Sequence, residues 1–397
     1  MILISLAAAT GVLSGVVTGV IPGIHPNTVI FTSLPVYLES SISLPLYLSF
    51  LTGMSISHTF HDFLPAIFLS APDADAALSA ISAPEMLAEG RGLEAFRYTV
   101  YGGIISVIAA AAASAPLYFL LDEIYSLISP FMEYILLFFL FYLVLESEKL
   151  VSAAVITAFA GTLGIISFKA PVNQQFVLVP VFSGLFAVPA VFSMLGTDFQ
   201  IPEQREPDVS FTSCFQGGLT GTLAGLMAGV FPGIGSAVST SFLTPMMDRS
   251  RRNFLAAMGA VNTSDMIFSL LTLQLLGKAR SGTSVALKAL SMPTESQMLF
   301  LGVLTLVSTL VSAVFAARFS RIYGSSLRDV PLRPVFYGVL LIVASATVVL
   351  TGLTGLLVLA VSSLIGMAAL ESENRKVCMA VLIVPSILFF ANIGIFM

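Results

Sequence analysis

Long apolar runs separated by short polar segments extend along the whole chain. The runs fall at about 2–21, 28–38, 42–57, 60–71, 97–121, 131–145, 150–168, 174–196, 211–231, 236–247, 254–277, 296–317, 335–350, 353–370 and 377–396. A helix that crosses a bilayer core of about 30 Å needs about 20 apolar residues. Runs of about a dozen residues bounded by Pro or Gly fit half-helices or re-entrant segments better. The pattern predicts an all-α polytopic membrane protein with about 10–14 membrane elements.

The composition agrees with this pattern and excludes other classes of protein. Hydrophobic residues make up 57% of the chain and charged residues 10%, whereas a soluble domain has about 25% charged residues. The net charge of −5 provides no basic surface for nucleic acid. Cys214 and Cys378 lie too far apart in sequence to form a metal-ligand motif. We therefore expect a multi-pass protein of the cell membrane with no metal and no other cofactor, except Na⁺ where it serves as a coupling ion. The first run begins at Ile2 with no cleavage site after it, so we expect it to be retained.

An internal repeat divides the chain into two halves. Residues Gly11, Gly15, Gly19, Pro22, Gly23 and Ile24 recur as Gly221, Gly225, Gly229, Pro232, Gly233 and Ile234, all at a shift of 210. The sequence LESE at 145–148 recurs at 370–373. Between the halves lies the polar stretch TDFQIPEQREPD at 197–208. We expect a first membrane repeat at 1–198, a polar linker at 199–210 and a second membrane repeat at 211–397.

The two halves differ in charge in a way that favours opposite orientations in the membrane. Residues 1–198 carry 4 Lys and Arg against 13 Asp and Glu, a net charge of −9, and residues 199–397 carry 13 against 9, a net charge of +4. Inverted repeats place matching loops on opposite sides, and cytoplasmic loops attract Lys and Arg. The sequence therefore predicts two inverted-topology repeats, and a duplication in parallel orientation is the alternative.

Each half contains a glycine-striped segment that ends in Pro-Gly. Glycine at every fourth position allows close helix packing in a membrane, and Pro followed by Gly breaks a helix. The half-helix after such a break presents backbone N–H groups and a positive dipole end to an anion. Paired interrupted helices point to the central site of a transporter. We predict that the solute is bound by Gly23, Ile24, Asn27, Thr28, Gly233, Gly235, Ser236 and Ser239.

Ionisable residues follow each break within apolar sequence. SHTFHD at 57–62 aligns to within about one residue with VNTSD at 261–265. Ionisable groups in a membrane are costly unless they face a cavity or one another. We therefore predict that the coupling cation, Na⁺ or H⁺, is held by Asp62, Asp265, Asn262, His58 and His61. For the two histidines, interhelical hydrogen bonding without a direct role is the alternative.

A basic turn in the second half is a further candidate for binding an anion. Lys278 and Arg280 occupy the position at which the first half has an acidic turn. Arginine suits bidentate recognition of a carboxylate or phosphate. The alternative is an ordinary cytoplasmic loop that follows the positive-inside rule.

An enzyme is a less favoured interpretation. His58, His61 and Asp62 could act as metal ligands, but a zinc hydrolase needs a further ligand and a general base. Neither His-Glu-x-x-His nor Gly-x-Ser-x-Gly occurs in the chain.

The two Pro-Gly-Ile breaks, LSAPD at 69–73 and PEMLAEGRGLEA at 84–95 resemble the TctA-like permeases, the large membrane subunit of tripartite tricarboxylate transporters. The resemblance implies a permease with repeated halves that moves carboxylates with a cation gradient, together with an extracytoplasmic solute-binding protein and a small membrane subunit. The chain departs from the family pattern at HDF (61–63) and TSD (263–265), and its second turn lacks Ile-Pro-Gly. It is also shorter than the family leads us to expect, which indicates a compact, archaeal branch.

Together these features predict a secondary active transporter of a small organic anion of the carboxylate class, with alternating access around the two breaks. The alternative is a translocase of polyprenyl phosphate that binds the phosphate head at the same half-helix ends. The partners that we expect are the lipid bilayer, the anionic solute and a second copy of the chain in a homodimer.

Overall fold

The computed structural model describes residues 2–21, 25–71, 79–196, 200–248, 250–290, 292–328 and 330–393. Within these ranges the chain is helical and contains no β-strand. The α-helices are α1 (Ile2–Val20), α2 (Pro26–Leu38), α3 (Leu44–His61), α4 (Phe63–Phe68), α5 (Ser79–Ala88), α6 (Gly92–Ile128), α7 (Met132–Leu145), α8 (Leu150–Ser167), α9 (Leu178–Phe182), α10 (Val188–Leu195), α11 (Phe215–Val230), α12 (Ser236–Leu243), α13 (Arg251–Leu276), α14 (Gly282–Leu290), α15 (Glu295–Arg328), α16 (Leu332–Glu371) and α17 (Ala380–Phe390).

Seven helical stretches of the described chain are long and apolar enough to cross a membrane. They are Ile2–Val20, Gly92–Leu145, Leu150–Ser167, Leu178–Leu195, Arg251–Leu276, Glu295–Arg328 and Leu332–Glu371. Large apolar side chains point outward from these helices, as Phe119 on α6 and Val349 on α16 show with 75% and 83% exposure. Such a surface is compatible with lipid and not with water. The prediction of an all-α polytopic membrane protein is confirmed.

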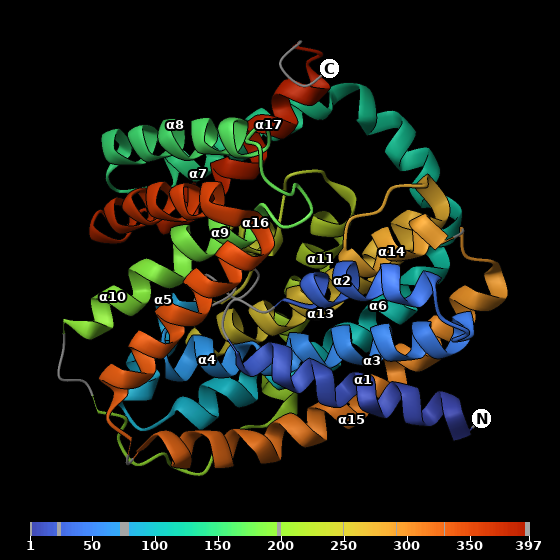
Figure 1. Ribbon diagram of the computed structural model, residues 1–397, viewed down its shortest axis with the longest axis horizontal. Coiled ribbons are helices and arrows are strands. Elements are labelled where there is room, and N and C mark those ends of the chain that lie inside the picture. Colours follow the sequence, from blue (N-terminus) through green and yellow to red (C-terminus); the bar gives the residue numbers. More distant parts are fainter. Residues whose placement is uncertain are drawn as a thin grey trace.

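The helices form two groups (Figure 1). The first, which we call the crossing bundle, contains α1, α3, α6, α11, α13 and α15 in mutual contact. The second, which we call the flanking bundle, contains α7, α8, α9, α10, α16 and α17. Each half of the sequence contributes its first helices to the crossing bundle and its later helices to the flanking bundle. The two bundles are therefore made from both halves of the chain.

The glycine stripes fix the tightest contacts of the crossing bundle. A Cβ atom added at Gly11 of α1 would lie 2.2 Å from the carbonyl oxygen of Phe50 on α3. One added at Gly15 would lie 2.3 Å from the carbonyl oxygen of Met54 on the same helix. A Cβ atom added at Gly221 of α11 would lie 2.3 Å from the carbonyl oxygen of Ala257 on α13. The pairs α1–α3 and α11–α13 therefore pack in the same way, backbone against backbone, as small residues allow in a membrane.

Several apolar runs are joined or bent differently from the expectation. The runs at 42–57 and 60–71 were expected as two short elements. In the structure, α3 continues through the first run to His61, and the short α4 follows it. The runs at 335–350 and 353–370 form α16, which bends at Gly352 with a φ of +70°. Left-handed backbone at this position favours glycine and kinks the helix.

The polar stretch between the halves lies against the protein. Residues 201–210 contain no helix. The backbone amide of Arg205 donates to the Gly90 carbonyl oxygen at 2.8 Å, and Gln204 accepts from the amide of Gly92 at 2.6 Å. These bonds attach the stretch to the turn between α5 and α6.

The second Pro-Gly break is visible in the backbone. Helix α11 ends at Val230, Gly233 has a φ of +74°, and α12 begins at Ser236. Of the first break, residues 22–24 lie outside the described residues, so the predicted binding residues Gly23 and Ile24 receive no structural account. The half-helix that follows, α2, begins at Pro26.

Candidate functional site

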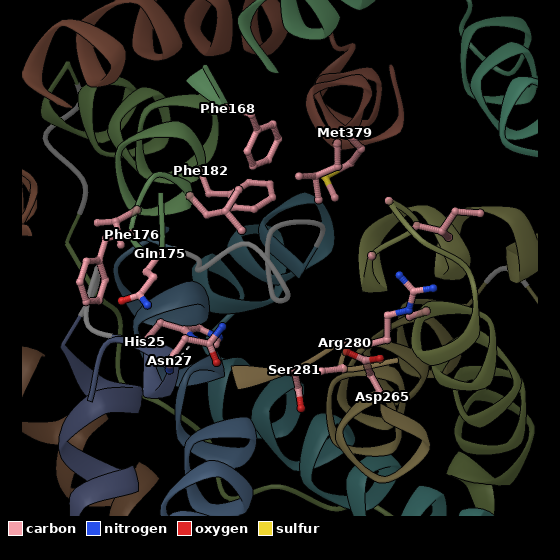
Figure 2. A pocket seen from close by; sticks show the side chains of 18 of the residues that line it. His25, Asn27, Phe168, Gln175, Phe176, Phe182, Asp265, Arg280, Ser281 and Met379 are labelled. Carbon is pink, nitrogen blue, oxygen red and sulfur yellow. Dashed lines mark hydrogen bonds between the residues drawn. The ribbon is translucent and has the colours of Figure 1, made fainter. Parts of the chain in front are cut away.

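A cavity of about 680 Å³ lies between the two bundles (Figure 2). On the side of the crossing bundle, its wall is formed by the start of α2, by the loop before α12, by α13 and by the loop before α14. On the other side, the wall is formed by residues 168–183 around the start of α9 and by the start of α17. The half-helix α2 and the loop before α12, which follow the two predicted breaks, thus face one shared space. Cavities of this size are typical of small-molecule sites.

The amino end of α2 is capped by its own residues. His25 is the N-cap, and its Nδ1 accepts a hydrogen bond from the amide of Asn27 at 3.1 Å. The amide of Thr28 donates to the His25 carbonyl oxygen at 2.9 Å, and Pro26 has no amide hydrogen. Asn27 and Thr28 line the cavity as predicted, but in this conformation their amides already have acceptors.

The loop before α12 offers amides to a ligand. Gly233, Ile234 and Gly235 line the cavity. The bonds found for the described part of the chain include no acceptor for the amides of Gly233 and Gly235, whereas the Ile234 amide faces the Phe231 carbonyl oxygen across the turn at 232–233. Gly235 is the N-cap of α12 and forms no side-chain cap. Amides without an acceptor before a helix form an anion-binding end, so the second break fits the predicted role more directly than the first.

A cation and an anion lie on the same wall. Figure 2 shows Asp265 of α13 beside Arg280, which belongs to the loop before α14. Nη2 of Arg280 donates to the Val230 carbonyl oxygen at 3.3 Å, where α11 ends, and its Nε has no hydrogen-bond partner among the described residues. Arg280 therefore places a guanidinium with spare donor capacity beside the second break.

Three of the predicted anion-binding residues lie away from the cavity. The Lys278 ammonium lies 3.9 Å from the centroid of the Tyr125 ring on α6 and also bonds the hydroxyl of that residue. Ser239 is fully buried in α12, and its hydroxyl donates to the Gly235 carbonyl oxygen at 3.1 Å. Ser236 is buried at the start of the same helix and is not part of the cavity wall.

A small polar chamber of about 60 Å³ adjoins the cavity. It shares His25, Asn27, Asp265 and Ser281 with the cavity wall. The remaining polar residues of its wall are Ser55, His58, Thr59, Asn262 and Thr283. Within the described residues, no three His, Cys, Asp or Glu side chains come together as a metal site. A chamber rich in hydroxyl, amide and carboxylate oxygens suits a hard monovalent cation, and its two imidazoles suit a proton.

Three of the predicted ion-coupling residues, His58, Asp62 and Asn262, lie together next to this chamber. The imidazoles of His25 and His58 lie with ring centroids 5.0 Å apart. Nε2 of His58 lies 4.0 Å from Oδ2 of Asp62, which accepts a hydrogen bond from Asn262 Nδ2 at 2.7 Å. Asp62 is thus buried behind the chamber and reaches it through His58 and Asn262.

His61 is separated from this group. Its Nδ1 lies 2.7 Å from the Ser57 carbonyl oxygen of its own helix. Its ring packs on Phe315 and Phe319 of α15, at centroid distances of 5.9 Å and 6.1 Å. The surroundings of His61 are those of an interhelical packing residue.

Several wall residues were not among the predicted site residues. His25 is the N-cap of a half-helix, and its position next to Pro26 was the available signal. Gln175 lies in the polar stretch NQQ at 173–175, between two apolar runs. Phe168 and Phe182 lie in apolar sequence, where nothing distinguishes a wall residue from one that faces lipid.

The chain has recognisable relatives. It is 27% identical to an uncharacterized protein of Methanocaldococcus jannaschii over 382 residues, which cover 92% of this chain and 94% of that protein. No solved structure matches the chain. Residues 6–381 match the tripartite tricarboxylate transporter TctA family. The chain therefore belongs to this family and is an integral-membrane transport protein, not an enzyme.

Proposed function

We propose that the protein is a secondary active transporter that moves a small organic carboxylate through the cavity between its two bundles. The observation that carries this proposal is the grouping of the Gly233 and Gly235 amides, for which the described part of the chain supplies no acceptor, with the Arg280 guanidinium on one cavity wall. Charge-assisted bonds from a guanidinium and from backbone amides are the usual means of holding a carboxylate in a site with little water.

The position of the cavity supports alternating access. The half-helix α12 links the bundles, because it contacts α11 and α13 of the crossing bundle and α7 of the flanking bundle, and each bundle is built from both halves of the chain. Rocking of the flanking bundle against the crossing bundle would close one side of the cavity and open the other. Gly233 and Gly352, both with left-handed backbone, are the hinge positions that we propose.

Exchanged contacts between the halves support inverted repeats. At the start of α13, the Arg251 guanidinium bonds Glu85 and Glu89, which lie near the turn from α5 to α6. At the start of α3, Leu44 and Leu48 pack with Leu287 and Met298, on either side of the turn from α14 to α15. The turn before α6 in the first half thus packs on the start of α13 in the second half. In the same way, the turn before α15 in the second half packs on the start of α3 in the first half, as expected for repeats related by a pseudo-twofold axis.

We place the coupling cation in the small polar chamber. Asp265 borders both the chamber and the cavity. A cation bound beside Asp265 would offset this negative charge next to the carboxylate site. The occupancy of the two sites would therefore be coupled. Na⁺ and H⁺ both fit this scheme.

The name of the family describes a tripartite system. We therefore propose that an extracytoplasmic solute-binding protein delivers the carboxylate and that a small membrane subunit accompanies this chain. The homodimer remains a prediction that the molecular mass of the purified protein would test.

Uptake by proteoliposomes tests the proposed function. We expect uptake of a radiolabelled carboxylate to require an inward gradient of Na⁺ or H⁺ and to be lost in Arg280→Gln, because Arg280 is the one lysine or arginine among the described residues of this wall. Lys278→Gln is the matched control, since this lysine packs on Tyr125 outside the cavity. Equal uptake by Arg280→Gln and the unaltered protein would contradict the proposed site. Binding of polyprenyl phosphate without any binding of carboxylates would instead support the lipid-carrier alternative.

A further inference from the structure

The two walls of the cavity differ in chemistry (Figure 2). Arg280, Asp265 and Ser281 lie on one side, together with the amides of the second break. Across the space lie Phe168 and Phe182, with Met379 at the edge. Leu178, Val179 and Leu382 extend this apolar side. The cavity is therefore amphipathic, with one end suited to a charged group and one end suited to an apolar one.

The polar side carries little net positive charge. Among the described residues of the wall, Arg280 is the one arginine, there is no lysine, and Asp265 is the one carboxylate. A charge taken from water into such a site is costly unless it is paired. A trianion would bring three negative charges to one guanidinium that already has a carboxylate beside it. When the coupling cation proposed above offsets Asp265, a single carboxylate is the cargo whose charge the Arg280 guanidinium can balance.

The apolar side of the cavity increases binding affinity only for a cargo with an apolar body. The free energy gained on binding to such a wall comes from apolar surface that both partners remove from water. Aromatic rings in particular pack edge-to-face or offset on the rings of other molecules. Citrate has three carboxylates and a hydroxyl on a skeleton of six carbon atoms, and contact with Phe168 and Phe182 would strip water from these groups without replacing it.

We infer that the cargo is a monocarboxylate with an aromatic or branched aliphatic body, rather than a tricarboxylate. This inference rests on the proposed function and specifies its substrate class. The carboxylate binds the Arg280 guanidinium and the amides of Gly233 and Gly235, and the body packs between Phe168 and Phe182. A cavity of about 680 Å³ accommodates a ring together with its carboxylate.

Four probes separate charge from apolar body in a binding experiment with the purified full-length protein. Phenylacetate carries one charge and a ring, acetate one charge and no ring, benzene-1,3,5-tricarboxylate three charges and a ring, and citrate three charges and no ring. Isothermal titration calorimetry measures each, and a thermal shift provides a second readout. We expect phenylacetate to bind at least about tenfold more tightly than the other three probes, since the match in charge and the burial of the ring each change the affinity by a factor of about ten or more.

Variants of the apolar wall test the location of the ring. Phe182→Ala is expected to weaken phenylacetate binding about tenfold and to leave acetate binding unchanged. Phe168→Ala provides an independent test in case Phe182→Ala does not fold. Phe159→Ala is the matched control, because this ring projects from α8 with 61% exposure and is absent from the cavity wall.

The possible failures of the inference and of the proposed function are distinguishable. Citrate binding as tightly as phenylacetate, or more tightly, would overturn the monocarboxylate inference and leave the carboxylate transporter standing. Unchanged phenylacetate affinity in folded Phe182→Ala and Phe168→Ala would overturn the placement of the ring. Failure of all four carboxylates to bind would overturn the inference together with the proposed function.

Discussion

His58 and Asp265 occupy equivalent positions in the two halves of the protein. A Cβ atom added at Gly15 of α1 would lie 2.9 Å from the backbone nitrogen of His58, and one added at Gly225 of α11 would lie 2.9 Å from that of Asp265. Both side chains border the small polar chamber. The two halves thus contribute an imidazole and a carboxylate, from matching positions, to one small space.

This relationship changes how the two buried carboxylates are compared. The next pair of matching glycines, Gly19 and Gly229, can be compared in the same way. Gly19 lies against the backbone nitrogen of Asp62, and Gly229 lies against the backbone nitrogen of Ser269. Asp62 therefore corresponds to a serine in the second half and not to Asp265. Only Asp265 reaches both the chamber and the cavity, which makes it the stronger candidate for coupling.

Asp265→Asn is expected to abolish gradient-driven uptake in proteoliposomes while leaving the melting temperature nearly unchanged. The amide retains the size of the side chain but neither binds a proton nor supplies the negative charge that a bound cation needs. Asp208→Asn, an exposed change in the polar stretch between the halves, is the control. Full gradient-driven uptake by Asp265→Asn would remove this residue from the coupling mechanism.

Asn262→Leu is expected to destabilise the protein by about 1–3 kcal/mol, because Asp62 loses its 2.7 Å hydrogen bond in a buried site. Thermal unfolding in detergent measures the effect. The double variant Asp62→Leu with Asn262→Leu is the informative comparison, since it removes the carboxylate together with its donor. If the single variant were as stable as the unaltered protein, the bond between Asp62 and Asn262 would not contribute to stability.

A matched pair of glycine variants tests the packing of the crossing bundle. In Gly225→Ala the new Cβ atom would lie 2.0 Å from the Ser264 hydroxyl oxygen on α13, whereas at Gly302 of α15 no atom of the described residues lies within 4 Å of the corresponding position. We expect Gly225→Ala to destabilise the protein by about 1–3 kcal/mol through overpacking. Gly302→Ala should be neutral or stabilising, because alanine favours a helix. Equal melting temperatures for the two variants would contradict the close contact between α11 and α13.

The membrane helices and the shared cavity could be predicted from the sequence because their causes are local. Apolar runs of sufficient length form membrane helices, and the repeated Pro-Gly marks the place where Gly233 leaves the helical conformation. Asn27 and Gly233, 206 positions apart, were both expected at the site on this basis, and both line the cavity.

The remaining features depend on contacts between distant segments. Lys278 and Arg280 are two positions apart, yet Tyr125 of α6 holds the first outside the cavity while the second enters it. The pattern of polar residues in the sequence favours an alignment of Asp62 with Asp265. The structure instead aligns His58 with Asp265, which is a shift of one helical turn. Packing of the glycine stripes determines this register, and neither segment carries that information by itself.

The contact between the Arg251 guanidinium and Glu89 is expected to weaken in acid. Hydrogen bonds from Arg251 and from Arg91 lower the pKa of the Glu89 carboxyl below its ordinary value. A carboxyl whose pKa is lower in the folded protein stabilises it above the unfolded pKa of about 4.3, and this contribution is lost as the pH falls through the lower folded value. The melting temperature of Glu89→Gln should therefore vary less between pH 6 and pH 3 than that of the unaltered protein. Because the contact is exposed, added salt should reduce the difference. Identical pH profiles at low salt would contradict a role for this contact in stability.

Gly233→Ala is expected to introduce both backbone strain and a steric clash at the second break, whereas Gly277→Ala introduces the strain alone. Both glycines have left-handed backbone, with φ of +74° and +65°, so alanine brings about 1–2 kcal/mol of strain at either position. At Gly277 a Cβ atom would have no neighbour within 4 Å in the described part of the chain, whereas at Gly233 it would lie 2.5 Å from the Ser386 hydroxyl oxygen on α17. Only Gly233→Ala should therefore push α17 away from the break and weaken carboxylate binding, because it disturbs the amides that we assign to the anion. Titration of both purified variants with phenylacetate measures this difference. Normal affinity in Gly233→Ala would show that the amides of the second break do not hold the carboxylate.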